Sequence, residues 1–374
     1  MCRVYVVKRP EGGSGIGTQS PLQDIIMNPL FFFFNPIEWF RMVNYLLQWF
    51  FSIFETWTRQ AYLKNKENET AVQGLAVGTN YCYSFGVTDK DAKHFLYRYD
   101  MKNGGNPKEM DDDASVKTLL HASDATLASY TDSNGVKHNL MYVDTWNDQG
   151  PTSYLVKLEY DSSGNYWEVA RYKYNDVDVT NKAGAKVTKY GSVARVKDYT
   201  KDGHPWAQFL LRSNRDFFTA EVRLDETVVT TNGKKVGTMD NPYELKPACK
   251  FQVNYEDNDT YTGQGIDYVS DNGGELYVAR WAWRKGLSDK KNENVILLYK
   301  GIDNAIANKP SKALDASKTW TIKNGDNPKI KFEIEGIGFP INSTDNKLWF
   351  NTNEADSADK KTNGGIYTDS KVTK

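Results

Sequence analysis

A pattern that recurs five times between residues 72 and 367 most constrains the fold of this chain. Each copy opens with a short strand, passes through a turn of Gly, Asn, Asp or Lys, and continues in a second, more apolar strand. Asn-Gly and Asp-Gly turns between alternating strands are strong signals for a β-hairpin. The copies begin at Val72 (VQGLAVGTNYCYSF), Ser123 (SDATLASYTDSNGVKHNLMYVDTW), Gly191 (GSVARVKDYTKDGHPWAQFLLRSN), Gly263 (GQGIDYVSDNGGELYVARW) and Ile334 (IEGIGFPINSTDNKLWFNTN).

A third strand follows each hairpin at a similar offset, and the second copy shows a fourth strand, NYWEVARYKY, from Asn165. Units of about 50–70 residues that each form a small antiparallel sheet are typical of propeller blades. Neighbouring blades bury the faces that one blade alone would expose. The sequence therefore predicts an all-β fold, a five-bladed β-propeller over residues 71–374. A large β-sandwich is the alternative, and the equal offsets favour the propeller.

The last copy ends soon after its third strand. Because propellers usually close by borrowing a strand from the other terminus, a strand near the N-terminus is expected in the last blade. RVYVVKR at residues 3–9 is the candidate for that strand, with the aromatic segment after it as an insertion. Residues 1–26 are expected to hold this strand and a Gly-rich linker.

Residues 27–70 form a distinct N-terminal module. Asn35 suits a helix N-cap and Pro36 the first helical position. Polar residues then follow at gaps of three or four, which places them on one stripe of an amphipathic, aromatic-rich helix from 36 to about 63. Such a helix could span a membrane, lie on one, or pack on protein, including a second copy in a homo-oligomer. The aromatic residues predicted to dock on a membrane or partner are Trp39, Phe40, Trp49, Phe50 and Phe54.

Composition excludes some classes of protein. The net charge is −1, so no basic face for nucleic acid is expected. The three cysteines form neither a disulfide framework nor a zinc motif, and no metal site or cofactor is predicted. The first 26 residues carry no recognisable signal peptide.

Polar residues at the starts of the first strands are the candidate site. In a propeller these strands line the central channel, so Gln73, Asp124, Gln264 and Glu335 are predicted ligand-binding residues at one rim. Asp124, Glu335 and Asp267 are also candidate catalytic acids, with His121 as the assisting histidine. The alternative is that these residues bond to neighbouring backbone, which the recurring Gln-Gly and Glu-Gly pairs favour.

Trp281 and Trp283 are predicted sugar-stacking residues, because strand alternation places both on one face. Packing between blades is the alternative for both tryptophans.

The fourth and fifth copies resemble a known family. GQGIDYVSDNGGELYVARW, FEIEGIGFPINSTDNKLWF and the closing GGIYT are similar to the C-terminal part of helveticin J type proteins, most clearly over residues 261–281 and 334–367. That resemblance implies a propeller-like fold and a bacteriocin-like antagonistic role, secreted or at the cell surface. It supplies no catalytic motif, and the aromatic segment lies outside it.

Three functions follow from the sequence. The first is a protein that binds a bacterial surface glycan or other envelope component, with the N-terminal helix on a membrane or partner. The second is a glycosidase-like enzyme that uses the channel carboxylates. The third is an oligomeric scaffold with a helical hub.

Overall fold

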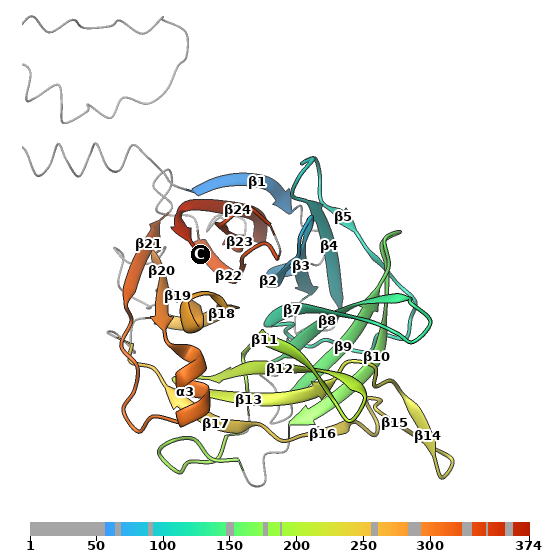
Figure 1. Cartoon of the computed structure of the whole chain (residues 1–374). Coiled ribbons are helices and arrows are strands. Elements are labelled where there is room, and N and C mark those ends of the chain that lie inside the picture. The colour runs from blue at the N-terminus through green and yellow to red at the C-terminus, as the bar shows by residue number, and fades with distance from the viewer. Residues whose placement is uncertain are drawn as a thin grey trace, which may run out of the picture. The chain divides into compact units, whose positions relative to one another are not determined.

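The computed structural model describes residues 57–63, 69–88, 93–146, 153–174, 179–187, 189–255, 261–282, 293–323, 331–341, 343–355 and 362–374. All of them belong to a compact unit that runs from Thr56 to Lys374. In this unit five antiparallel sheets are arranged as blades around a centre (Figure 1). The predicted all-β, five-bladed propeller is therefore confirmed.

Four blades are each formed from consecutive parts of the chain, with the first strand innermost. The first blade comprises β2 (Glu69–Val77), β3 (Tyr81–Thr88), β4 (His94–Asp100) and β5 (Lys108–Glu109). The second comprises β7 (Asp124–Thr131), β8 (Lys137–Thr145), β9 (Tyr154–Tyr160) and β10 (Asn165–Tyr174). The third comprises β11 (Ser192–Lys201), β12 (His204–Ser213), β13 (Asp216–Arg223) and β17 (Ala248–Gln252). The fourth comprises β18 (Tyr261–Val269), β19 (Glu275–Ala282), β20 (Glu293–Lys300) and β21 (Lys318–Lys323).

The fifth blade is composite. Its order is β22 (Lys331–Gly338), β23 (Lys347–Ala355), β24 (Thr362–Thr373) and β1 (Trp57–Leu63). The expectation that an N-terminal strand closes the ring is correct in kind, but β1 occupies the place proposed for residues 3–9. Residues 3–9 lie outside the described part of the chain.

The helix predicted for residues 36 to about 63 is wrong over Trp57–Leu63, which form β1. Trp57, Arg59, Ala61 and Leu63 are partly or fully buried, whereas Thr58 and Tyr62 between them are exposed. This alternation of buried and exposed side chains, with a period of two, is typical of a strand that pairs along the edge of β24. The rest of the predicted helix, with Trp39, Phe40, Trp49, Phe50 and Phe54, lies outside the described residues.

Apolar side chains fill the spaces between neighbouring blades. Between the second and third blades, for example, the rings of Tyr142 and Phe209 lie 4.5 Å apart within one buried cluster. Each innermost strand contacts the next, and β22 contacts β2, so the ring is closed. The core is thus distributed around the ring, as expected for stacked blades.

The outermost strand of the second blade carries additional segments. β6 (Asp111–Asp112) and β16 (Tyr243–Leu245) both pair with β10 in parallel. Between β13 and β16 the chain forms a two-stranded ribbon of β14 (Val229–Thr231) and β15 (Lys234–Val236), which projects from the ring (Figure 1).

Helices are short in the described part of the chain. They include η3 (Asp271–Gly273) and α3 (Ile302–Asn308) in the fourth blade. Among the described residues, no helix has the length and apolar character that crossing a bilayer requires.

Candidate ligand-binding rim

Asp124 joins three of the innermost strands. Its carboxyl is fully buried. Oδ1 accepts the Ala125 N–H at 3.0 Å, and Oδ2 accepts the N–H groups of Val193 on β11 at 3.2 Å and Ile266 on β18 at 3.0 Å. Burial raises the pKa of this carboxyl well above its ordinary value, with the three N–H groups acting in the opposite direction. Asp124 therefore braces the second, third and fourth blades.

Asp267 has the same role one blade further on. Oδ1 accepts the Tyr268 N–H at 2.9 Å, and Oδ2 accepts the N–H of Phe339, just beyond β22, at 2.8 Å. Burial raises the pKa of Asp267 to about 7. Oδ2 therefore holds the fourth blade to the fifth, and Oδ1 bonds within the fourth blade.

The repeated Gln-Gly and Glu-Gly pairs coincide with irregularities in the innermost strands. The register shifts at Gln73-Gly74, Gln264-Gly265 and Glu335-Gly336, each between a residue before the pair and one after it. A Cβ on Gly336 would lie 2.3 Å from the Leu75 backbone nitrogen. Glycine at these bulges lets neighbouring inner strands approach more closely than any side chain would permit.

The polar residues beside these glycines contact protein groups. Gln264 donates from Nε2 to Glu333 Oε1 at 2.7 Å, and its carbonyl accepts the Ser192 hydroxyl at 2.8 Å. The Gln73 carbonyl accepts Asn351 Nδ2 at 2.5 Å. Gln73 and Glu335 are both buried. These contacts favour a structural role, and ligand binding by these residues stays a prediction.

The other predicted residues that the structure describes belong to different blades. His121 is half-buried in the loop before β7, where its backbone N–H donates to the Trp146 carbonyl at 3.2 Å. Trp281 is 5% exposed within β19, so a sugar could stack on it only if the ring were uncovered. Trp283 lies outside the described residues.

A buried carboxyl that sequence reasoning missed is Asp144, at the end of β8. It lies directly opposite Asp124 in the β7–β8 register, so the two side chains share a face of the sheet. Oδ1 accepts the Tyr174 hydroxyl at 2.6 Å, and in the described structure Oδ2 has no hydrogen-bond partner. Burial raises the pKa of Asp144 to about 8, which leaves it largely protonated at neutral pH.

Arg212, at the end of β12, is a second group that sequence reasoning missed. It is 4% exposed, and within the described structure its Nη1 has no hydrogen-bond partner. Its positive charge lowers the pKa values of both Asp124 and Asp144, against the larger effect of burial. A Cβ on Gly263 would lie 2.8 Å from Arg212 Nη2, so this glycine makes room for the guanidinium.

Arg280 on β19 completes this group. Its guanidinium carbon lies 3.9 Å from the centre of the Tyr255 ring, and Arg280 is as buried as Arg212. Both arginines lower the pKa of Tyr255, which burial raises. Two cations therefore flank one aromatic ring where the third and fourth blades meet.

We call Ser123, Asp144, Arg212, Tyr255 and Arg280 the rim cluster. Ser123, whose buried Oγ also has no hydrogen-bond partner in the described structure, precedes β7, and its N–H donates to the Asp144 carbonyl at 2.9 Å. Asp144, Arg212 and Arg280 lie near the ends of second strands, at the same end of the blades where the innermost strands begin. The cluster gathers a largely neutral carboxyl, a hydroxyl and two guanidiniums at this end of the blades. Among the described residues, no group of three or more His, Cys, Asp or Glu side chains is placed to hold a metal ion.

Comparison with known proteins gives no family. No protein-family model and no curated protein sequence matches this chain. Among solved structures, a GH32 β-fructofuranosidase of Bombyx mori is similar with a TM-score of 0.41 and 10% identity, over 90% of this chain and 67% of that chain. A fucose-specific lectin from Aleuria aurantia matches with a TM-score of 0.32 and 9% identity, over 80% of this chain and 78% of that chain.

A xylan β-1,4-xylosidase from Bacillus halodurans C-125 matches with a TM-score of 0.36 and 9% identity, over 81% of this chain and 54% of that chain. This chain thus spans about two thirds of the β-fructofuranosidase and about half of the xylosidase. Likeness at this level carries no conclusion about a ligand or a reaction, so the proposed function rests on the residues themselves.

Proposed function

We propose that this chain is a carbohydrate-binding protein that holds a glycan at the rim cluster. The proposal rests on three buried polar atoms at one end of the second and third blades that find no hydrogen-bond partner among the described residues: Ser123 Oγ, Asp144 Oδ2 and Arg212 Nη1. A buried polar group left unsatisfied destabilises a protein by roughly 1–3 kcal/mol, so native structures retain few of them.

A sugar suits this set of groups. Its hydroxyls both donate and accept, and they would supply partners to a neutral carboxyl, a hydroxyl and a guanidinium together. Tyr255 is buried beneath the Arg280 guanidinium and holds that cation near these groups. A few convergent polar groups are typical of small-molecule sites.

A glycosidase is the second candidate, because two buried acids have raised pKa values. Asp144, at about 8, and Asp267, at about 7, would be protonated when a general acid must donate. Asp124 and Asp144 are also directly opposed on β7 and β8, and retaining glycosidases place two carboxyls about 5–5.5 Å apart. The three N–H groups on Asp124 weigh against it as a nucleophile, since they already occupy its oxygens.

A glycan array and a hydrolysis assay on the full chain separate the two functions. We expect glycan binding without release of sugar, weakened in Arg212→Gln and Asp144→Asn. Arg223→Gln, which removes a partly exposed arginine of the same blade, is the matched control and should bind normally. Sugar release that disappears in Asp144→Asn would favour the enzyme. Absence of both retained glycan and released sugar would refute both candidates.

The bacteriocin-like role is a further part of the proposal, supported by the sequence resemblance. In it the propeller would recognise an envelope component of a target cell, and the aromatic segment before residue 57 would dock on a membrane or on another copy. Liposome flotation of the full chain, compared with a version lacking residues 1–55, tests the membrane role. Equal flotation of both versions would remove it. The truncation stops at residue 55 because β1 belongs to the propeller.

A further inference from the structure

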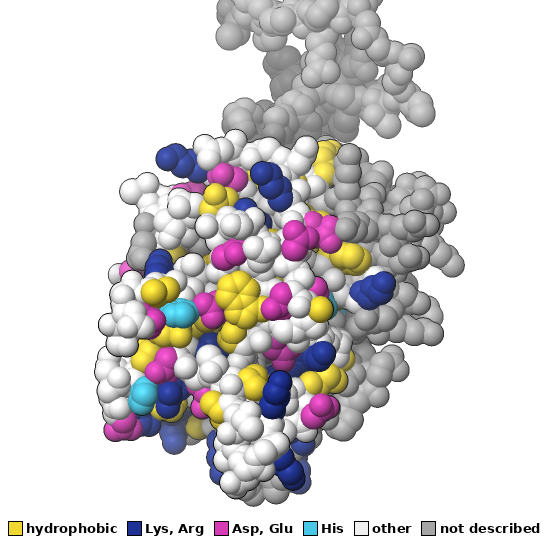
Figure 2. Space-filling model, turned by 90° about the vertical axis from the view of Figure 1, so that its right-hand side faces the viewer, with side chains coloured by type: hydrophobic (Ala, Val, Ile, Leu, Met, Phe, Trp, Pro, Cys, Tyr) yellow, Lys and Arg dark blue, Asp and Glu magenta, His cyan; other side chains and the backbone are white. Residues whose placement is uncertain are grey.

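A second candidate site lies at the outer edge of the second blade, on β10, the strand of its meander farthest from the channel. A cavity of about 880 Å³ opens there between the segment after β6 and the segment that contains β14 and β15. Figure 2 shows the side of the molecule from which this ribbon projects, with basic, acidic and apolar side chains intermixed. The cavity is lined by Ser115, Lys117, Glu168, Val228, Lys234, Lys235, Gly237, Thr238, Met239, Asp240 and Asn241.

One wall of the cavity is attached to β10 by backbone hydrogen bonds. The Arg171 N–H donates to the Gly237 carbonyl at 2.9 Å, and the Val228 N–H donates to the Val169 carbonyl at 2.9 Å. Gly237 has a φ of +88°, and a Cβ there would lie 2.5 Å from the Tyr243 ring. A turn that needs glycine and is bonded on both sides is preformed rather than shaped by a ligand.

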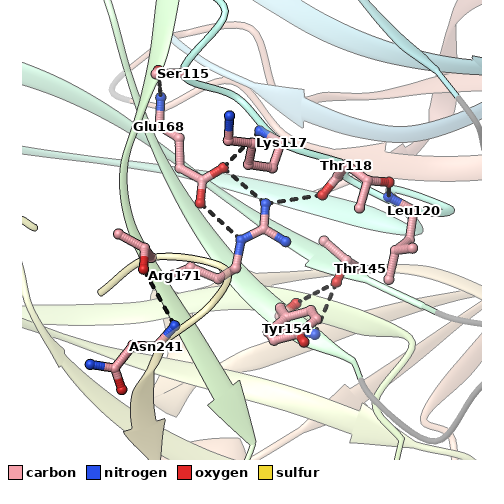
Figure 3. Close-up of polar contacts among 10 residues, drawn as sticks. Ser115, Lys117, Thr118, Leu120, Thr145, Tyr154, Glu168, Arg171 and Asn241 are labelled. Atoms are coloured by element: carbon pink, nitrogen blue, oxygen red, sulfur yellow. Dashed lines mark hydrogen bonds and ion pairs between the residues drawn. The ribbon is translucent and has the colours of Figure 1, made fainter. Parts of the chain in front are cut away.

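The opposite wall is held by Glu168. Its backbone N–H donates to Ser115 Oγ at 2.9 Å, and its Oε2 accepts the Lys117 N–H at 3.1 Å (Figure 3). These bonds fix Ser115 and Lys117 beside the cavity.

The floor of the cavity is electrically neutral. The Arg171 guanidinium donates to both oxygens of Glu168, at 2.8 and 2.9 Å (Figure 3). The side chains of this pair are 0% and 6% exposed. A two-point arginine–carboxylate pair satisfies its own charges, so Glu168 does not repel an anion.

The other charged residues that line the cavity carry a net positive charge. Lys117, Lys234 and Lys235 are exposed, and among the described lining residues the acids are Asp240 and the paired Glu168. Three lysines around a neutral floor favour an anion, because an ammonium group is a compact positive charge that donates hydrogen bonds to carboxylate, sulfate or phosphate.

We infer that this cavity binds an anionic saccharide, at a site separate from the rim cluster. Its volume lies in the range of about 300–1,000 Å³ typical of ligand pockets. None of the described lining residues is aromatic, which disfavours a nucleotide, since bases are held by stacking on aromatic rings. Ser115, Thr238 and Asn241 supply hydroxyl and amide groups for sugar hydroxyls, and the lysines supply charge for the acid.

Calorimetric titration of the full chain tests the inference with three probes. These are an oligogalacturonate, a heparin-derived tetrasaccharide, and maltotetraose as the uncharged control. We expect an acidic probe to bind and maltotetraose not to bind at this site. Lys117→Gln/Lys234→Gln/Lys235→Gln should weaken the acidic probe about tenfold or more, by removing ion pairs that each contribute modestly. Met239→Trp should weaken it similarly by filling the cavity without changing its charge.

The control variant Lys137→Gln/Lys312→Gln/Lys347→Gln removes the same charge from exposed lysines elsewhere. It should bind as the wild type does. Equal weakening in both triple variants would show general attraction to the surface and overturn the inference. So would normal binding by Met239→Trp, or failure of both acidic probes to bind. Arg212→Gln should leave this binding unchanged, which keeps the test independent of the rim cluster.

Discussion

The innermost strands and the outer strands of this propeller are held by different kinds of contact. Around the channel, side chains of one blade bond to the backbone of the next, as Asp124 does to β11 and β18 and Asn351 does to Gln73 on β2. On the outside, whole segments from elsewhere in the chain add to a blade edge, as β1 adds to β24 and β16 to β10.

This difference indicates where the fold tolerates substitutions and inserted segments. An inner residue must match the backbone of a neighbouring blade, whereas an added outer segment needs only a free strand edge and an apolar face. The outer segments therefore accommodate new structure, such as the β14–β15 ribbon and its cavity.

Removing β1 is expected to have the largest effect and tests whether an outer strand can be dispensable. Deletion through Leu63 would expose the edge of β24 and remove the ion pair of Arg59 with Glu354, 2.9 Å apart. It would also uncover the core that Ala61 and Leu63 cover. We expect loss of cooperative thermal unfolding, measured by calorimetry. A version lacking residues 1–55 is the control and should unfold cooperatively; equal behaviour of the two versions would contradict the role of β1.

Gly336→Ala is expected to be the most damaging single substitution in the inner ring. The new Cβ would clash with the Leu75 backbone, which cannot move without shifting β2. Destabilisation of about 3 kcal/mol or more is expected, because overpacking and backbone shifts act together. Gly135→Ala, in an open turn with a φ of +82°, should cost only about 1 kcal/mol. Urea denaturation compares the two variants, and similar losses would refute close packing at the bulge.

Asp124→Asn tests the brace itself. An amide has one acceptor oxygen where the carboxyl has two, so at least one buried N–H would face a donor. The expected loss is about 2–3 kcal/mol in chemical denaturation. Asp132→Asn, in an exposed turn where the carboxylate also accepts backbone N–H groups, should lose less than half as much. A neutral effect of Asp124→Asn would mean that the inner ring does not depend on this carboxyl.

The smallest expected effect is a change in pH dependence. Asp267 has a raised pKa of about 7 in the folded state, so between the unfolded value near 3.8 and about 7 the folded state binds more protons than the unfolded state. Its contribution to stability is therefore greatest below that window, falls as pH rises through it, and is constant above. Asp267→Asn should flatten the decline in melting temperature between pH 4 and 7. An unchanged slope would contradict the raised pKa.

The sequence predicted the repeating part of this fold well. The hairpins that begin at Val72, Ser123, Gly191, Gly263 and Ile334 all form, and NYWEVARYKY coincides with β10. These elements are readable because turn chemistry and alternation are local. β5 and β17 were not predicted, because a short outer strand owes its pairing to a neighbour rather than to its own pattern.

The closing strand shows why a local sequence pattern is not enough to predict every strand. WTRQAYL carries alternation, but it follows a segment with helical spacing, and its partner β24 is some 300 residues away, as the Arg59–Tyr367 hydrogen bond indicates. Asp144 and Arg212 were missed for a similar reason. Each ends an apolar strand, YVD and LLR, and the signal available was a charged residue at a position where burial is expected.

Closure by β1 also bears on the order in which the molecule can form. During synthesis β1 is made before any blade, whereas its partner β24 follows all the other strands of the ring, so the fifth blade cannot be completed until β24 has been made. Until then β1 and the growing last blade present unpaired strand edges, which are templates for wrong association. Contacts of such long sequence separation slow folding. The contact that closes the finished ring therefore leaves a period during synthesis in which the chain is prone to wrong association. A chaperone or a segment that covers these edges would protect the chain most during that period.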